Sequence, residues 1–214
     1  MDLRPHDLLW LDRPAYFLPA GELPAWLDDA WLARAPLVVR REAVAGDNVP
    51  VGARGMQRNQ RCAGRVQAGA IGRRVSPAML AKSVPDRVDQ LAAAAGLWPC
   101  VAALLSLAPR LDALGIDWGP AGGAGFWLAS GLPVLRATSD LDLLVRAPSR
   151  MDPDLVAALN ALQASAPCRL DIQVDTDIGG FALSEYVRGS GRILLKTAHG
   201  PQLVADPWMQ PEAA

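Results

Sequence analysis

The chain has 214 residues, of which 51% are hydrophobic and 20% charged, and its 21 basic and 22 acidic side chains leave a net charge of −1. This composition excludes extensive disorder, and the near-zero net charge provides no field that would draw the molecule onto nucleic acid or an anionic membrane. The length fits one domain, or one domain with a smaller companion.

The N-terminal segment and the cysteines bear on the cellular compartment. Asp2, Arg4 and Asp7 lie where a secretory signal would need an apolar run. Cysteine is sparse, and the spacing of the three cysteines fits neither a zinc site nor a disulfide framework. We therefore expect a cytoplasmic protein.

Short apolar runs separated by turn formers predict strands and a hairpin between residues 36 and 74. The same stretch is rich in arginine, at Arg40, Arg41, Arg54, Arg58, Arg61, Arg65, Arg73 and Arg74. Such a stretch can clamp phosphates by bidentate contacts, dock an acidic protein by electrostatic steering, or form a solvated face. These three interpretations stay open at this point.

Helix is predicted from Ser76-Pro77, a side-chain cap followed by proline at the first turn, to about Leu114. Apolar residues recur at three- and four-residue steps along this stretch, and Pro99 is expected to separate two helical segments. The apolar positions are Leu91, Ala95, Trp98, Val101, Leu105 and Ala108. The uncharged window at 90–109 contains Gly96 and Pro99, so it is interpreted as buried helix rather than a membrane span.

The pattern in the remaining half of the chain predicts alternating strands and helices. Residues 116–131 indicate a strand, a glycine-rich turn and a short helix, and 133–145 an extended pair of segments. Residues 151–164 predict a helix opened by Asp152 and Pro153, and 169–174 a half-buried strand. Short strands are expected at 193–195 and 203–205, followed by a frayed tail from Trp208.

The most informative local feature is an acidic pair, Asp140 and Asp142, on an apolar strand. In an extended chain, residues two apart face the same side, so the two carboxylates would lie roughly 7 Å apart while Leu141 and Leu143 anchor the other face. A Mg²⁺ ion would relieve their repulsion, because it prefers oxygen ligands and commonly uses one or two carboxylates together with substrate phosphates. The alternative is an edge strand with its charges facing water.

Two neighbouring features favour the metal site. Gly122 and Gly123 lie at a strand-to-helix turn, where backbone N–H groups can approach a phosphate. Asp171 lies on the polar face of a later strand, where it would complete a three-carboxylate site. Asp175 competes for this third place; Asp171 is preferred because Asp175 is expected in a turn beyond the strand.

The order of glycine pair, acidic pair and further acid resembles the signature of the nucleotidyltransferase superfamily. Several segments are more specifically similar to the phosphoribosyl-dephospho-CoA transferases of malonate decarboxylase, also called its holo-acyl-carrier-protein synthases. These segments are residues 4–10, 49–55, 118–128, 139–148 and 197–208.

The resemblance implies an enzyme that transfers the prosthetic group of malonate decarboxylase from triphosphoribosyl-dephospho-CoA to a serine of the apo acyl carrier protein subunit, releasing diphosphate. It implies that Asp140 and Asp142 are catalytic acids that bind Mg²⁺, and we add Asp171 to this set. Donor binding is assigned to Gly122, Gly123, Ser139, Arg54, Arg58, Arg61 and Lys196.

For the architecture we expect an α/β fold, with a mixed sheet of nucleotidyltransferase type, flanking helices and a smaller strand-containing N-terminal domain. The N-terminal domain, residues 1–76, would bind donor or carrier, and residues 77–214 would form the catalytic domain. Two alternative functions are another nucleotidyltransferase that moves AMP from ATP onto a protein or small molecule, and a non-catalytic arginine-rich binding module. We expect neither nucleic acid nor membrane as a partner.

Overall fold

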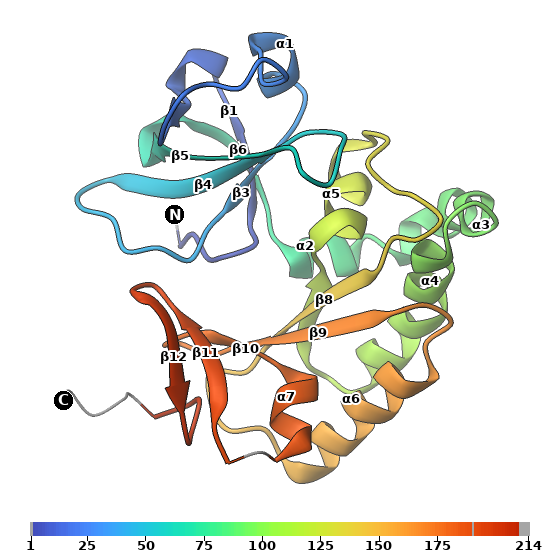
Figure 1. Cartoon of the computed structure of the whole chain (residues 1–214). Coiled ribbons are helices and arrows are strands. Elements are labelled where there is room, and N and C mark those ends of the chain that lie inside the picture. The colour runs from blue at the N-terminus through green and yellow to red at the C-terminus, as the bar shows by residue number, and fades with distance from the viewer. Residues whose placement is uncertain (1, 190, 210–214) are drawn as a thin grey trace. The chain divides into compact units, whose positions relative to one another are not determined.

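A computed structural model describes residues 2–189 and 191–209 of the chain (Figure 1). The chain forms two compact units. The first comprises Met1–Ser76 and Phe126–Val134, and the second Pro77–Gly125 and Leu135–Ala214. The acidic pair therefore belongs to the second unit and the arginine-rich stretch to the first.

The first unit is built on an antiparallel sheet with the strand order β2-β5-β4-β3-β1-β6. Its strands are β1 (Leu8–Leu11), β2 (Leu18–Pro19), β3 (Leu37–Val39), β4 (Asn48–Arg54), β5 (Arg61–Gln67) and β6 (Ile71–Val75). Short helical elements join them: α1 (Asp29–Leu32) and the 3₁₀ turns η1 (Pro14–Tyr16) and η2 (Ala68–Ala70). The strands and hairpin predicted between residues 36 and 74 are confirmed.

Alternation along β4 explains the core of the first unit. Val49, Val51 and Ala53 are buried while the residues between them are half-buried, as expected for a strand with one face on a core. The sequence did not predict β1, although it lies between β3 and β6 in the sheet. Its four consecutive apolar residues show no alternation, and its neighbours in the sheet come from distant segments.

The second unit contains most of the helix. Its helices are α2 (Pro77–Lys82), α3 (Val88–Ala95), α4 (Pro99–Ala113), α6 (Pro153–Ser165) and α7 (Leu183–Arg188), with the 3₁₀ turn η3 (Pro85–Arg87) before α3. Helix α5 (Gly122–Ser130) begins in this unit and ends in the first. Asp152 caps α6 by accepting a hydrogen bond from the Asp154 N–H at 2.8 Å, as predicted.

The sheet of the second unit is mixed, with the strand order β12-β11-β10-β9-β8-β7. Its strands are β7 (Asp117–Pro120), β8 (Leu141–Arg146), β9 (Leu170–Asp175), β10 (Gly180–Ala182), β11 (Ile193–Thr197) and β12 (Gly200–Val204). Strands β8 and β9 run parallel and are connected through α6, because a parallel pair needs a crossover. All other neighbouring pairs are antiparallel, and the predicted α/β class is confirmed.

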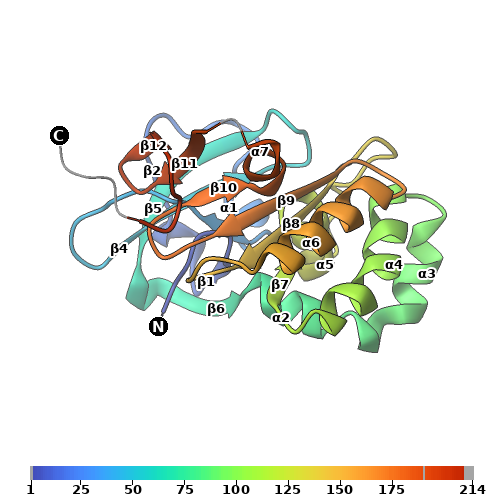
Figure 2. The same ribbon diagram turned by 90° about the horizontal axis from the view of Figure 1, so that it is seen from below.

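Helices α6 and α7 cover one face of this sheet (Figures 1 and 2). Phe181, in the middle of β10, points to that face, since its ring lies 5.5 Å from the ring of Tyr186 on α7. The same face carries the buried Leu143 of β8 and Ile172 of β9. Residues at the alternate positions of each strand therefore point to the opposite face.

Pro99 separates two helical segments, as predicted. It starts α4, whose buried residues are Cys100, Val101, Ala103, Leu104, Leu107, Ala108 and Leu111. Two other local predictions were wrong. The first half of 133–145 is not extended, because a turn forms there in which the Arg136 carbonyl accepts from the Ser139 N–H at 3.0 Å.

The chain also does not fray at Trp208. Its ring packs edge-on against Phe181 and Tyr186, at 5.3 and 5.5 Å between centroids, and its indole N–H donates to the Ala147 carbonyl at 2.9 Å. The predicted tail beyond Met209 lies outside the described residues. Within the described part of the chain, no helix is both long and apolar enough to cross a bilayer.

Candidate active site

Two of the predicted acids are brought side by side by the parallel pairing of β8 and β9. Asp142 and Asp171 are direct partners in this register, so both point to the face opposite α6 and α7, about 4.8 Å apart at their Cα atoms. Both are half-buried. We call this face of the second sheet the acid face.

The glycine turn reaches the same place. Ala121 N–H donates to the Asp142 carbonyl at 2.8 Å, which ties the end of β7 to β8. Gly122 follows with φ +53°, and a Cβ added there would overlap the Asp142 carboxylate. The start of α5 thus contacts Asp142 through bare backbone, and Gly122 is itself exposed. The first N–H groups of a helix lack partners in its own ladder, so this turn can receive an anion.

Asp140 directly precedes β8 and lies near two thiols. Burial, followed by the influence of Cys168 and of Asp140, raises the pKa of Cys100 to about 11. Burial and the charge of Asp140 also raise the pKa of Cys168. Both thiols are therefore protonated at neutral pH, which argues against either of them as a nucleophile.

Asp171 and Asp175 have different surroundings, although they share the acid face. The Asp171 carboxylate lies 3.1 Å from the guanidinium of Arg169, and the two side chains are 43% and 73% exposed. An ion pair this exposed contributes little and leaves the carboxylate accessible.

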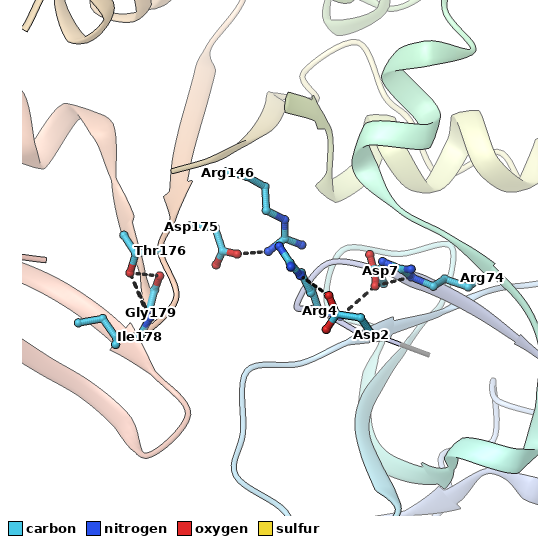
Figure 3. A network of polar contacts seen from close by, with 9 residues as sticks. All are labelled: Asp2, Arg4, Asp7, Arg74, Arg146, Asp175, Thr176, Ile178 and Gly179. Atoms are coloured by element: carbon cyan, nitrogen blue, oxygen red, sulfur yellow. Dashed lines mark hydrogen bonds and ion pairs between the residues drawn. The ribbon is translucent and has the colours of Figure 1, made fainter. Parts of the chain in front are cut away.

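Asp175, by contrast, is buried in an ion pair with Arg146, its direct partner on β8 (Figure 3). It is the last residue of β9, so the prediction that it belongs to the following turn was wrong. The sequence missed this pair because it depends on the register between strands about thirty residues apart. Continuing the alternation of Leu170, Ile172 and Val174 by one step would have placed Asp175 on the polar face.

The carboxylates on the acid face partly meet the ligand requirements of a hard cation. Carboxylate oxygens are the ligands that Mg²⁺ prefers, and a site of one or two carboxylates completed by water and substrate phosphates is typical. Within residues 2–189 and 191–209, however, no three acidic, histidine or cysteine side chains gather closely enough to hold a metal ion. Asp142, with Asp140 or Asp171, fits the two-carboxylate arrangement.

The predicted donor-binding arginines gather in the first unit. Arg54 and Arg61 are direct partners across β4 and β5, and Arg58 lies in the hairpin that joins these strands. Partial burial and the nearby charge of Arg58 lower the pKa of Arg61 from its ordinary value. Arg54 also stacks on Phe126, with its guanidinium carbon 5.5 Å from the ring centroid. Like charges directly opposite each other are destabilising, so this hairpin favours binding an anion.

Ser139 and Lys196, the other predicted donor-binding side chains, lie in the second unit. The Ser139 Oγ accepts a hydrogen bond from the Arg136 N–H at 3.0 Å, so it shapes the turn before Asp140. Lys196 is exposed on β11, where its direct partners are Gly180 on β10 and Pro201 on β12.

The N-terminal segment at 4–10 contains a buried charge that the sequence reasoning did not single out. Asp7 is completely buried, and its Oδ2 accepts from the Arg74 Nε at 2.7 Å and the Arg4 backbone N–H at 2.9 Å (Figure 3). His6, next to it, has a φ of 74°. Because Asp7 joins this segment to β6, its role is to hold the N-terminus in the first sheet.

Comparison with protein families gives matches to both parts of the chain. Residues 4–77 match the model of the phosphoribosyl-dephospho-CoA transferase MdcG N-terminal domain, and residues 87–207 match that of the C-terminal domain.

Characterised relatives extend over nearly the full length. The chain is 44% identical to a phosphoribosyl-dephospho-CoA transferase of Klebsiella pneumoniae (strain 342), over 98% of both chains. It is 42% identical to one of Pseudomonas syringae pv. tomato, over 95% of this chain and 92% of the relative. A third, of Pseudomonas putida (strain GB-1), is 41% identical over 99% and 98%. No solved structure matches the chain.

Proposed function

The chain belongs to the phosphoribosyl-dephospho-CoA transferase family, and on that premise we propose that it loads the acyl carrier protein subunit of malonate decarboxylase with its prosthetic group. The donor is triphosphoribosyl-dephospho-CoA, the acceptor is a serine of the apo carrier subunit, and diphosphate is the second product. The enzyme is then a Mg²⁺-dependent nucleotidyltransferase.

The proposed step is an in-line displacement at the phosphorus of the triphosphate that is bonded to the ribose of the triphosphoribosyl group. The serine Oγ forms a new P–O bond while the bond from that phosphorus to the bridging oxygen of the diphosphate breaks. The serine proton leaves to an acid-face carboxylate or to water, and the diphosphate departs with the electron pair of the broken bond. A phosphodiester joins carrier and prosthetic group, and no redox change occurs.

The observation that carries this proposal is that the glycine turn contacts Asp142, which lies beside Asp171. Gly122 touches the carboxylate of Asp142, and Asp142 is the direct neighbour of Asp171 on the acid face. A helix start that accepts phosphate and a pair of carboxylates that accepts a cation are therefore adjacent. Phosphoryl transfer relies on such positioning and charge neutralisation, since the protein itself has little covalent chemistry to do.

Each candidate residue has a role in this scheme. Asp142, together with Asp140 or Asp171, would hold Mg²⁺, which would neutralise phosphate charge and lower the pKa of the attacking hydroxyl. Gly122 and Gly123 present backbone N–H groups to the phosphates, assisted by Ser139. Bidentate contacts from Arg54, Arg58 and Arg61 and the point charge of Lys196 would bind the rest of the polyanionic donor.

The test measures diphosphate release and the mass of the carrier subunit with purified apo carrier, donor and Mg²⁺. The wild-type chain should add one phosphoribosyl-dephospho-CoA group to one serine. Asp142→Asn should lower the rate at least 10²-fold, since it removes a ligand of the cation that would stabilise the charge on the reacting phosphate. Asp177→Asn, an exposed acid in the β9–β10 turn, is the matched control and should keep wild-type activity.

Three outcomes would count against the proposal. If Asp142→Asn is as active as Asp177→Asn, the acid face is not the catalytic site. If the chain labels protein from radioactive ATP but not from the CoA-derived donor, it is an AMP-transferring nucleotidyltransferase instead. A salt-sensitive complex with the carrier but no transfer would indicate a binding module.

A further inference from the structure

The acid face continues beyond the acids to the edge of the second sheet. The register brings Asp175 of β9 opposite Gly180 of β10, and Gly180 opposite Lys196 of β11. Strand β11 in turn pairs Lys196 with Pro201 of β12. Because side chains alternate, the positions two residues along each strand belong to the same face.

Exposure of these positions rises steadily towards the edge. Leu144 on β8 is 1% exposed and Gln173 on β9 is half-buried, whereas Ala182 on β10 is exposed. Leu194 on β11 is 38% exposed and its direct partner, Leu203 on β12, is 58% exposed. We call Ala182, Leu194, Pro201 and Leu203 the outer strip.

The outer strip is apolar and carries no charge of its own. Among the described residues of β10, β11 and β12, Lys196 is the only charged one on the acid face. A paired leucine couple on an exposed sheet edge is unusual, because edges are commonly protected by charge. Here Pro201 supplies the protection against an added strand, since it has no N–H to donate. A partner would therefore rest on the face of the strip instead of extending the sheet.

We infer that the outer strip is the docking surface for the folded acceptor protein of the transfer reaction. The inference rests on the proposed function, which requires an acceptor protein to bring its hydroxyl to Asp142 and Asp171. The strip lies on the same face of the same sheet as these acids. The acceptor would then have to present apolar side chains beside its target serine.

The dimensions of the sheet agree with this assignment. Three strand spacings separate β9 from β12, which is about 14 Å. A protein–protein interface of standard size buries about 800 Å² on each partner, equivalent to a disc of about 16 Å radius. Leu194 and Leu203 also lie two residues, or about 7 Å, along the strands from the row of Asp171, so an interface centred on Asp171 covers Leu194 and reaches Leu203 at its rim. These two leucines are the side chains from which it would gain apolar burial.

The test separates docking from chemistry by measuring the KM for the apo carrier subunit and the KM for the donor. Leu194→Asp/Leu203→Asp should raise the carrier KM at least tenfold and leave the donor KM within twofold of wild type. Leu97→Asp is the matched control, because Leu97 is 66% exposed in the same unit but follows α3, outside the sheet. It should leave both constants unchanged.

A milder variant, Leu203→Gln, guards against misfolding and should raise the carrier KM at least threefold with an unchanged melting temperature. An unchanged carrier KM in both strip variants would overturn the inference. So would sedimentation showing that the strip variants convert a dimer to a monomer with no change in carrier KM, since the strip would then join two copies of this chain. Absence of transfer by the wild-type chain would instead refute the proposed function, and the docking surface with it.

Discussion

A substitution at the glycine turn tests whether the backbone at Gly122 sets the position of the catalytic carboxylate. Gly122→Ala makes two changes at once. The residue has φ +53°, a conformation that an L side chain rarely adopts, and the new Cβ would overlap the Asp142 carboxylate. Gly115→Ala is the matched control, because Gly115 has φ +65° and no heavy atom within 4 Å of the added Cβ.

Both variants should be less stable than wild type. Placing alanine in the left-handed region costs roughly 1–2 kcal/mol in either case. At Gly122 the added Cβ would also lie 2.9 Å from the Asp142 Cβ, which side-chain rotation does not move, so this variant should be the less stable of the two. For a chain of this length, each kcal/mol lowers the melting temperature by about 2–4 °C, so Gly115→Ala should melt about 2–8 °C below wild type and Gly122→Ala lower still.

The transfer activity of Gly122→Ala should be much lower than that of Gly115→Ala. Displacement of the Asp142 carboxylate by about 1 Å changes its position relative to the reacting phosphate. A displacement of that size costs about 10²-fold in rate. Gly115→Ala should retain activity at a temperature where both variants are folded. Binding of Mn²⁺, followed by electron paramagnetic resonance, should weaken only in Gly122→Ala. Equal activity and equal Mn²⁺ affinity in the two variants would refute the role assigned to this contact.

Three further predictions concern the charged and buried groups. Asp175→Asn should destabilise the chain by about 3–5 kcal/mol in urea unfolding, because it removes the buried carboxylate from the ion pair with Arg146, whereas Asp171→Asn should cost at most about 1 kcal/mol and abolish transfer. Arg74→Met leaves a fully buried carboxylate without its cation, so it should lower the urea midpoint more than Arg40→Met, which removes an exposed pair. The thiol of Cys100 should resist iodoacetamide at pH 8 in the native chain. Because folding raises its pKa to about 11, its contribution to stability is complete below about pH 9 and is lost as the pH rises towards 11, which pH-dependent urea unfolding would detect. Rapid alkylation at pH 8, or a larger cost at Asp171 than at Asp175, would contradict these assignments.

The elements that hold the site could be predicted because their signals are local. Leu170, Ile172 and Val174 alternate with polar residues, and alternation alone places Asp171 on the polar face of a strand. A glycine pair between a short strand and an apolar run likewise indicates a turn into a helix. Both signals depend on neighbours within a few residues, so no knowledge of the tertiary structure was needed.

Elements stabilised by distant pairing escaped prediction. Strand β10 has three residues and lies between β9 and β11, and α7 follows it directly. A segment of three residues is too short to show a periodic pattern of apolar and polar residues. Its burial comes from Phe181, whose ring packs against Tyr186 and Trp208, and the second of these contacts joins residues far apart in sequence.

Asp171 is preferred to Asp175 as the third acid because the two carboxylates are neutralised by different ion pairs. The sequence predicts that Asp171 and Asp175 lie on or just after one strand, but it does not show which of them forms a buried ion pair. In the structure Asp175 is buried and neutralised by Arg146, and recruiting its carboxylate to a metal would break this largely buried ion pair. Asp171 has only an exposed pair with Arg169, which a cation can displace at small cost. Since Asp171 is also the direct neighbour of Asp142, accessible negative charge concentrates at the start of the two parallel strands. The proposed metal and phosphate chemistry is therefore assigned to that end, and the ion pair of Asp175 with Arg146 at the other end stabilises the sheet that carries the acids.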